Sequence, residues 1–176
     1  MIAATSASPR YAPMLPYLFV YGTLCPDCTG VFGRNERLRL AAEGDVVGTA
    51  TVRGHLLDLG SYPGLVDNVA DGDAVGRGSD VGSSQDVGSS QGAGLGGTGR
   101  VHGLLIDMHR PAFTLAWLDT YEMATGEADA EYDRVVADAV LQSGETRSSW
   151  LYRLRLAPVD RKVVPDGIWR GRLIAT

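Results

Sequence analysis

The stretch EYDRVVADAVLQSGETRSSWLYRLRL, residues 131–156, decides the fold class. Residues 131–142 and 146–156 are two runs rich in β-forming residues, and the short segment SGE separates them. Two such runs joined by a short glycine-containing separator are typical of a β-hairpin. The stretch therefore predicts two long antiparallel strands.

Strand-like segments continue on the N-terminal side of this hairpin. YLFVYG (17–22) is apolar and aromatic and stops at a glycine, and VHGLLIDM (101–108) is a second apolar run. VVGTATVRGHLLDLG (46–60) alternates over much of its length, which predicts two strands that bend at Gly54. The ordered part of the chain is therefore mostly β-sheet.

Two helices are expected between these strands. PAFTLAWLDTYE (111–122) begins with a proline, which suits a first helical turn, and Phe113, Trp117 and Tyr121 recur at the spacing of one helix face. NERLRLAAE (35–43) predicts a shorter helix. Many strands, few helices and mostly short connections favour an α+β fold, a small and mostly antiparallel β-barrel flanked by short helices.

Length and composition favour a single small domain. The chain has 176 residues and a net charge of −5, which disfavours a nucleic-acid partner. It lacks an apolar run of the ~18 residues that a membrane span needs, and its start is a poor signal peptide. We expect a disordered tail at 1–16, one domain at 17–176, a cytoplasmic location, and a monomer or weak homodimer.

Residues 70–99 form a low-complexity segment inside that domain. Half of its positions are glycine or serine, and DVGSSQ occurs twice in tandem, at 80–85 and 86–91. Such a composition buries too little apolar surface to offset its chain entropy, so it predicts a flexible loop. A slipped repeat without function is the simplest interpretation.

The loop after the first strand, FVYGTLCPDCTG (19–30), carries two competing signals. Cys25 and Cys28 have the spacing of a redox dithiol or of half a zinc site. Structural zinc needs two further ligands, however, and the chain's histidines, His55, His102 and His109, are scattered singly. Redox or zinc chemistry is therefore the weaker reading of this loop, and we expect no bound metal.

Glu122 ends the predicted helix at 111–122. It lies four residues after Leu118, so it can face the edge of the core, where desolvation raises a carboxyl pKa toward the range of a general base. A solvated carboxylate at a helix end is the alternative. Asp119 is expected on the solvent side or capping a turn.

Five segments in fixed order resemble the gamma-glutamylcyclotransferase-like family, which includes gamma-glutamylamine cyclotransferases and plant avirulence-induced-gene-like proteins. They are YGTL (21–24), GHLLDLGSYPGLV (54–66), VHGLLIDM (101–108), LDTYE (118–122) and EYDRVVADAV (131–140). The resemblance implies a small mixed β-barrel with a cavity at its mouth. It also implies a cofactor-free enzyme that cleaves a gamma-glutamyl amide and releases 5-oxoproline.

The same resemblance implies roles for individual residues. Glu122 corresponds to the catalytic glutamate. Tyr21 and the backbone amides of Gly22, Thr23 and Leu24 would bind the substrate. The list of expected pocket residues is completed by Tyr132 and Tyr152, with Tyr62 as a turn or pocket-wall residue and Arg134 as a support for the sheet or a partner for an acid.

Three departures from the family pattern bear on substrate preference. The turn is followed by Cys25-Pro26-Asp27-Cys28 where a basic, glycine-rich sequence is common, Met123 follows the glutamate, and the 70–99 insertion joins two core strands. A non-catalytic binding module for a small carboxylate ligand stays open as an alternative.

Overall fold

The computed structural model describes residues 14–67, 99–156 and 160–170. The expected tail up to residue 13 and the low-complexity segment up to residue 98 lie outside the described residues.

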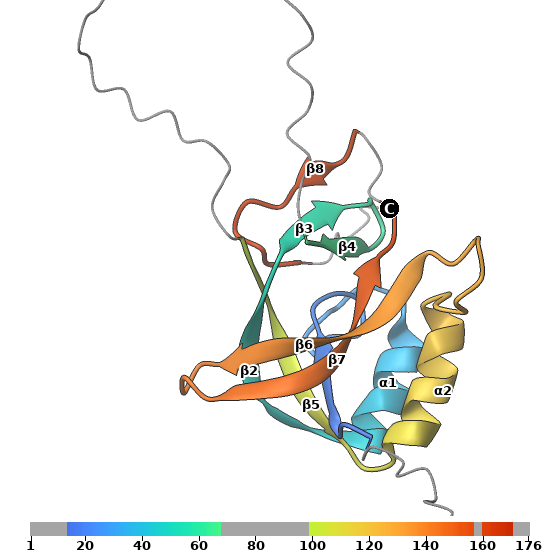
Figure 1. The fold of residues 1–176 in the computed structure, drawn as a ribbon, viewed down its shortest axis with the longest axis vertical. Coiled ribbons are helices and arrows are strands. Elements are labelled where there is room, and N and C mark those ends of the chain that lie inside the picture. Colours follow the sequence, from blue (N-terminus) through green and yellow to red (C-terminus); the bar gives the residue numbers. More distant parts are fainter. Residues whose placement is uncertain (1–13, 68–98, 157–159, 171–176) are drawn as a thin grey trace, which may run out of the picture.

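Five strands form a closed barrel in the order β1-β5-β2-β6-β7. They are β1 (Tyr17–Val20), β2 (Gly44–Arg53), β5 (Arg100–Met108), β6 (Tyr132–Leu141) and β7 (Thr146–Leu154). The β6–β7 pair is the expected antiparallel hairpin, and Gly144 in its turn has φ 88°. The barrel closes where β1 runs parallel to β7, with Leu18 opposite Trp150. The structure therefore confirms the mixed, mostly antiparallel barrel (Figure 1).

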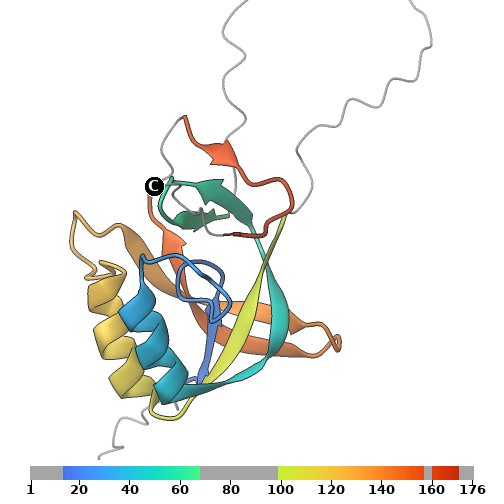
Figure 2. The same cartoon turned by 180° about the vertical axis from the view of Figure 1, so that it is seen from behind.

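A second sheet of three strands covers one end of the barrel (Figures 1 and 2). It contains β4 (Pro63–Val66), β3 (His55–Asp58) and β8 (Lys162–Val163) in that order. Gly54 lies between β2 and β3 with φ 136°, and a Cβ there would meet the Val66 carbonyl oxygen at 2.7 Å. Glycine is needed at this bend for both reasons, and the predicted bend is confirmed.

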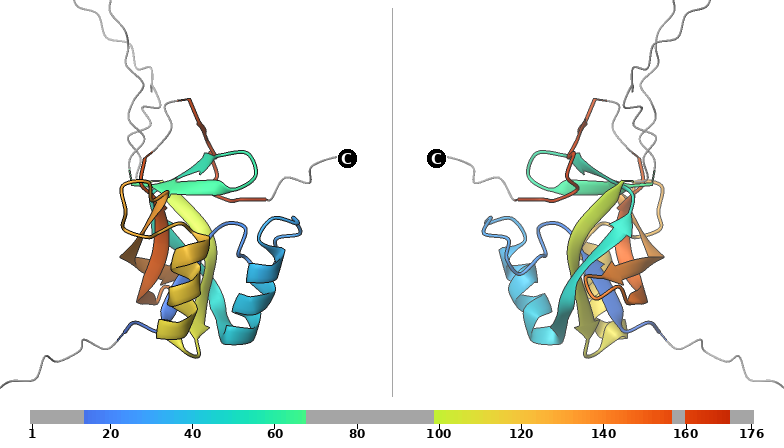
Figure 3. Two further views of the ribbon diagram at one scale, coloured as in Figure 1. Left: turned by 90° about the vertical axis from the view of Figure 1, so that its right-hand side faces the viewer. Right: turned by 90° about the vertical axis from the view of Figure 1, so that its left-hand side faces the viewer.

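The helices α1 (Arg34–Glu43) and α2 (Pro111–Tyr121) lie on one side of the barrel. Figure 3, in which this side faces the viewer on the left, shows them splayed apart. No helix within the described residues is long and apolar enough to cross a membrane.

The aromatic stripe of α2 is not the face that lies deepest in the core. The face in the core consists of Thr114, Leu115 and Leu118, whereas Phe113 is 50% exposed. The guanidinium groups of Arg39 and Arg110 lie 5.6 and 4.6 Å from the centre of the Phe113 ring. Cation–π contacts at the surface thus take the place of core packing for this ring.

Strand β1 divides its side chains between two apolar clusters. Leu18 and Val20 pack in a cluster that includes Leu115 and Leu118 of α2, whereas Phe19 and the following Tyr21 belong to a second cluster with β2, β5 and β7. Successive strand side chains point to opposite faces, which explains this alternation. The turn after β1 is consequently fixed at the boundary between barrel and helices.

Candidate active site

A cavity of about 270 Å³ lies where the end of β1 meets the start of β4, the end of α2 and the start of β6. Its wall contains all of the residues expected to act on or bind a substrate: Tyr21, Gly22, Thr23, Leu24, Glu122, Tyr132 and Tyr152. These residues come from four separate segments of the chain. The fold therefore brings the predicted set together.

Glu122 is the residue at the C-terminal end of α2, and its N–H donates to the Leu118 carbonyl at 2.8 Å. Burial raises the pKa of its carboxyl to about 8, and the nearby charge of Glu131 adds to the rise. The side chain keeps some exposed surface because it faces the cavity. Among the described residues, none forms a hydrogen bond or ion pair with this carboxylate. An unpartnered carboxyl of this kind is suited to exchanging protons with a ligand.

Glu131 and Tyr62 form a second polar pair in the cavity wall. The Tyr62 hydroxyl donates to Glu131 Oε1 at 2.7 Å, and the Phe32 ring stacks on Tyr62 with the ring centres 5.6 Å apart. Tyr62 was weighed as a wall residue, whereas Glu131 and Phe32 were not identified from the sequence. Phe32 lies in an irregular loop, so no periodicity could have indicated its position.

The segment after β1 is a tight turn, closed by a hydrogen bond from the Cys25 N–H to the Gly22 carbonyl at 3.0 Å. A Cβ on Gly22 would meet Cγ and Cδ of Pro63 at 2.8 and 3.0 Å. Glycine is therefore required because the β4 proline lies against the turn. Within the described residues, the amides of Thr23 and Leu24 donate no hydrogen bond, whereas the Gly22 N–H is directed at the Cys25 thiol. Thr23 and Leu24, the residues with these free amides, line the cavity together with Glu122.

Three tyrosines of the wall have their hydroxyl protons committed to other protein groups. Tyr21 donates to the Tyr152 carbonyl at 2.6 Å, Tyr132 to the Pro63 carbonyl at 3.0 Å, and Tyr152 to Asp119 Oδ1 at 2.8 Å. Burial is the main cause that raises the pKa of all three phenols, so they stay neutral. Their rings shape the wall, and their hydroxyl oxygens remain able to accept.

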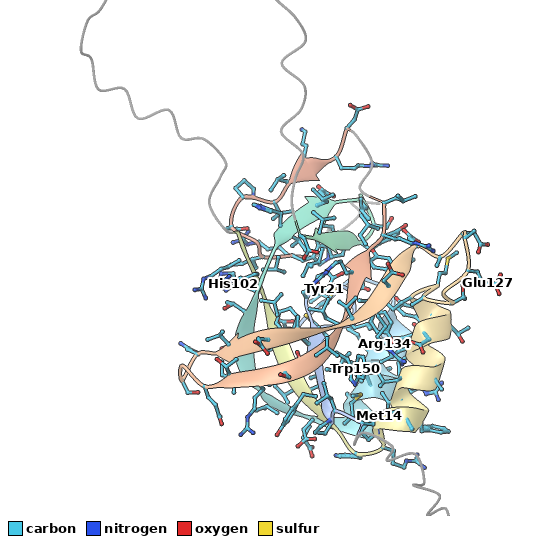
Figure 4. All side chains as sticks on the ribbon, in the orientation of Figure 1. Met14, Tyr21, His102, Glu127, Arg134 and Trp150 are labelled. Carbon is cyan, nitrogen blue, oxygen red and sulfur yellow. The ribbon has the colours of Figure 1, made fainter. Side chains whose placement is uncertain are left out.

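Asp119 does not lie where the sequence suggested. It is partly buried, and its Oδ2 forms an ion pair with Arg134 Nη1 at 2.9 Å in addition to accepting from Tyr152. Arg134 also lies over the Trp150 ring, 4.9 Å from its centre, and Figure 4 shows the two side chains together on the β6–β7 hairpin. The expected acid partner of Arg134 is confirmed, and that partner holds Tyr152 against the cavity.

The two cysteines lie at the edge of this site. Cys25 Sγ donates to the Val20 carbonyl at 3.4 Å, and burial raises its pKa to about 12, so it is a poor thiolate. Both thiols are free. In the described part of the chain, no three His, Cys, Asp or Glu side chains are grouped to hold a metal ion. Figure 4 shows His102 on the side of the barrel away from the helices.

Comparison with known proteins adds a family to this geometry. The family model "Gamma-glutamyl cyclotransferase, AIG2-like" matches residues 85–171. This range includes Glu122, Tyr132 and Tyr152 but not the turn at 21–24. No curated protein sequence matches the chain.

Two solved structures match the chain in a structural comparison. YkqA from Bacillus subtilis is 18% identical with a TM-score of 0.51, and the comparison covers 89% of this chain but 40% of YkqA. The uncharacterised protein PH0828 from Pyrococcus horikoshii is 14% identical with a TM-score of 0.49, and 86% of this chain and 87% of PH0828 are covered. The chain thus spans less than half the length of YkqA, and the likeness to YkqA concerns the fold alone.

The closed barrel, the ordered motifs and the matching family model agree with one another. The chain resembles the AIG2-like gamma-glutamyl cyclotransferase family, and residues 85–171 carry the match.

Proposed function

We propose that this protein is a cofactor-free cyclotransferase that cleaves a gamma-glutamyl amide and releases 5-oxoproline, with Glu122 as the general base and acid. The observation that carries the proposal is the position of Glu122. Its unpartnered carboxyl group shares one cavity with Thr23 and Leu24, the two residues of the turn whose amides are free.

The turn amides are suited to the anionic oxygens of the substrate. Successive N–H groups in a tight turn form a concave site that binds a carboxylate. The substrate's α-carboxylate would occupy it and would place the neighbouring α-ammonium near Glu122. The hydroxyl protons of Tyr21, Tyr132 and Tyr152 are committed. The donors left in the described wall for a developing oxyanion are the free turn amides and the paired hydroxyls of Thr23 and Tyr121.

The reaction needs no nucleophile from the protein, because the substrate carries its own. Glu122 takes a proton from the α-ammonium, and the freed amine attacks the γ-carbonyl carbon to close a five-membered ring. The γ C–N bond then breaks, and Glu122 returns the proton to the leaving nitrogen. In all, two protons move from the α-nitrogen to the amine that departs, which leaves as an ammonium.

The raised pKa of Glu122 supports both steps. A carboxyl with a pKa of about 8 is a far stronger base than an ordinary glutamate once it is ionised, and it donates readily when protonated. Holding the amine against the carbonyl supplies the rest of the acceleration, since effective molarities of ~10⁵ M or more are reached by well-oriented groups.

The proposal is tested by incubating the protein with a panel of gamma-glutamyl amines and gamma-glutamyl peptides. The expected result is release of 5-oxoproline in amounts equal to the released amine, without added metal or cofactor. Tight binding of these compounds without turnover would instead support a non-catalytic binding module. Release of free glutamate would indicate hydrolysis and would contradict the cyclisation.

A further inference from the structure

Arg37, on α1, is a buried cation beside the turn at 22–24. It is only 9% exposed, and its guanidinium donates to three backbone carbonyls. Nη1 bonds to Thr23 at 2.7 Å and to Phe32 at 2.9 Å, and Nη2 bonds to Gly30 at 2.5 Å. Within the described residues, no carboxylate forms an ion pair with it. A buried charge without a counter-charge is costly, so this arrangement calls for an explanation.

The bond to Thr23 determines which way the next amide points. In a trans peptide unit the C=O and the following N–H point in opposite directions. Since Arg37 binds the Thr23 carbonyl, the Leu24 N–H points away from the guanidinium. By the same reasoning, the bond from Cys25 to the Gly22 carbonyl directs the Thr23 N–H away from Cys25. Both directed amides belong to residues that line the cavity and both are free.

The charge of Arg37 also acts on the wall of the cavity. Burial raises the pKa of the Tyr121 hydroxyl and of the Cys25 thiol, and the Arg37 charge opposes both rises. Tyr121 lines the cavity. A positive charge bound to the Thr23 carbonyl polarises that peptide unit and makes the Leu24 N–H a stronger donor.

We propose that Arg37 is a positioning residue for an anionic subsite, because it holds the Thr23 and Leu24 amides toward the cavity. Its positive charge also polarises the Thr23–Leu24 peptide unit, and the negative charge of a bound substrate carboxylate compensates it. This inference rests on the proposed function for the identity of the substrate. The same side chain ties the loop at 30–32 to the turn, so the lip of the cavity and the carboxylate subsite are held by one group.

Two lactams separate carboxylate binding from catalysis. 5-Oxoproline carries the carboxylate, and 2-pyrrolidinone is the same ring without it. Binding of each is measured by NMR titration for the wild type, for Arg37→Met and Arg37→Lys, and for Arg39→Met. Arg39 is the matched control because it lies on the same helix and bonds to Glu43 instead of to the turn.

We expect the wild type and Arg39→Met to prefer 5-oxoproline by tenfold or more, since hydrogen bonds to charged groups discriminate strongly. Arg37→Met should bind the two lactams equally. Arg37→Lys keeps the charge but lacks the planar fork, so its preference should fall between these limits. If Arg37→Met does not fold, the result for Arg37→Lys decides. A preference of Arg37→Lys for 5-oxoproline over 2-pyrrolidinone as strong as that of the wild type overturns the inference.

Kinetics with two anilides complete the test. Gamma-glutamyl-p-nitroanilide and 4-aminobutyryl-p-nitroanilide can close the same ring, but only the first carries the α-carboxylate. Arg37→Met should raise KM for the first by tenfold or more, with a smaller effect on kcat and little effect on the second. An equal loss on both substrates would show a merely structural role and would contradict the inference.

The failure of this inference can be told apart from the failure of the proposed function. If the wild type turns over its substrate but the lactam preference is unchanged when Arg37 is replaced, only the inference about Arg37 is overturned. An Arg37-dependent lactam preference without any turnover overturns the cyclotransferase and leaves the anionic subsite standing. Equal binding of both lactams by the wild type overturns the inference whatever the turnover.

Discussion

Glu122 has its unusual chemistry because of where α2 ends. The helix stops at Tyr121, and the next residue faces a cavity whose wall also contains several tyrosine rings and Glu131. Burial and the Glu131 charge both disfavour the ionised form, which raises the pKa of the Glu122 carboxyl to about 8. This single position supplies the proton acceptor of the proposed reaction.

The pH dependence of activity follows from this pKa. Only ionised Glu122 accepts a proton, so kcat/KM should rise with pH, reach half of its plateau near pH 8, the value of the raised pKa, and level off above it. Glu131→Gln removes the like charge and should move this rise to lower pH. The check is a kcat/KM profile for both proteins, and a wild-type rise centred near the ordinary glutamate pKa of about 4.3 would contradict the assignment.

The stability of the protein should depend on the same group. Between the ordinary value of 4.5 and about 8, the folded protein keeps the Glu122 proton that the unfolded chain has lost. The contribution of Glu122 to the free energy of unfolding is therefore fully present below this pH window and is lost as the pH rises through it. Glu122→Gln has no carboxyl to ionise and so does not lose stability in this window. The free energy of unfolding of the variant minus that of the wild type should therefore be larger at pH 8 than at pH 4.5, by roughly 2 to 4 kcal/mol.

Urea unfolding of both proteins at several pH values measures this difference. Glu127→Gln is the control, because Glu127 is exposed. A wild type and a Glu122→Gln variant whose curves stay parallel across the window would show that the Glu122 carboxyl is solvated.

At the scale of elements, the turn after β1 depends on a close approach between two segments. Gly22→Ala would place a Cβ 2.8 Å from the Pro63 ring, which forces the turn or β4 to move. We expect a loss of stability of about 1–3 kcal/mol and a loss of activity beyond tenfold, because the turn amides move with it.

Gly48→Ala is the matched control for this change. Its Cβ would meet only Leu141 Cδ2 at 3.6 Å, an ordinary contact, on a strand away from the cavity. Comparing melting temperatures and 5-oxoproline release in the two variants checks the claim. Equal behaviour of the two alanine variants would count against it.

The two helices are joined by a polar cluster at Glu43, the last residue of α1. Its carboxylate accepts from Thr114 Oγ1 at 2.8 Å, from Trp117 Nε1 at 2.9 Å and from Arg39 Nε at 2.9 Å. Burial opposes ionisation, but these hydrogen bonds together lower the pKa of the Glu43 carboxyl. The cluster fixes the helix that carries Glu122 against the helix that carries Arg37.

Glu43→Ala should lower the free energy of unfolding by about 1–3 kcal/mol, because the fully buried Thr114 hydroxyl loses its acceptor. Thr114→Val removes the same bond without leaving a buried donor unpaired, so its cost should be smaller. Urea denaturation measures both. A larger loss in Thr114→Val would mean that packing around α2, and not the Glu43 cluster, joins the helices.

At the scale of the whole molecule, the sequence predicted the elements better than their pairing. The hairpin at 131–156, the bend at Gly54 and both helices follow from local pattern and are confirmed. The parallel contact of β1 with β7 could not be read from either strand, because periodicity shows a strand's faces and not its neighbour.

The same limit explains the errors in and around the cavity. Asp119 was expected on the solvent side or capping a turn because its partner Arg134 comes from a distant strand, which the pattern of the helix does not show. Glu131 and Arg37 were not identified because their roles depend on tertiary contacts. The predicted set of wall residues was found through the ordered family motifs, and physics alone left Glu122 undecided.

The central claim is that Glu122 drives an intramolecular cyclisation, and product analysis of Glu122→Gln tests it most directly. Glutamine keeps the size of the side chain but cannot accept the proton, so 5-oxoproline release from a gamma-glutamyl substrate should fall by about 10²–10⁴-fold. Glu131→Gln, which changes a neighbouring carboxylate in the same wall, should retain most of the wild-type rate at pH 8. Release by Glu122→Gln at the wild-type rate would contradict the account.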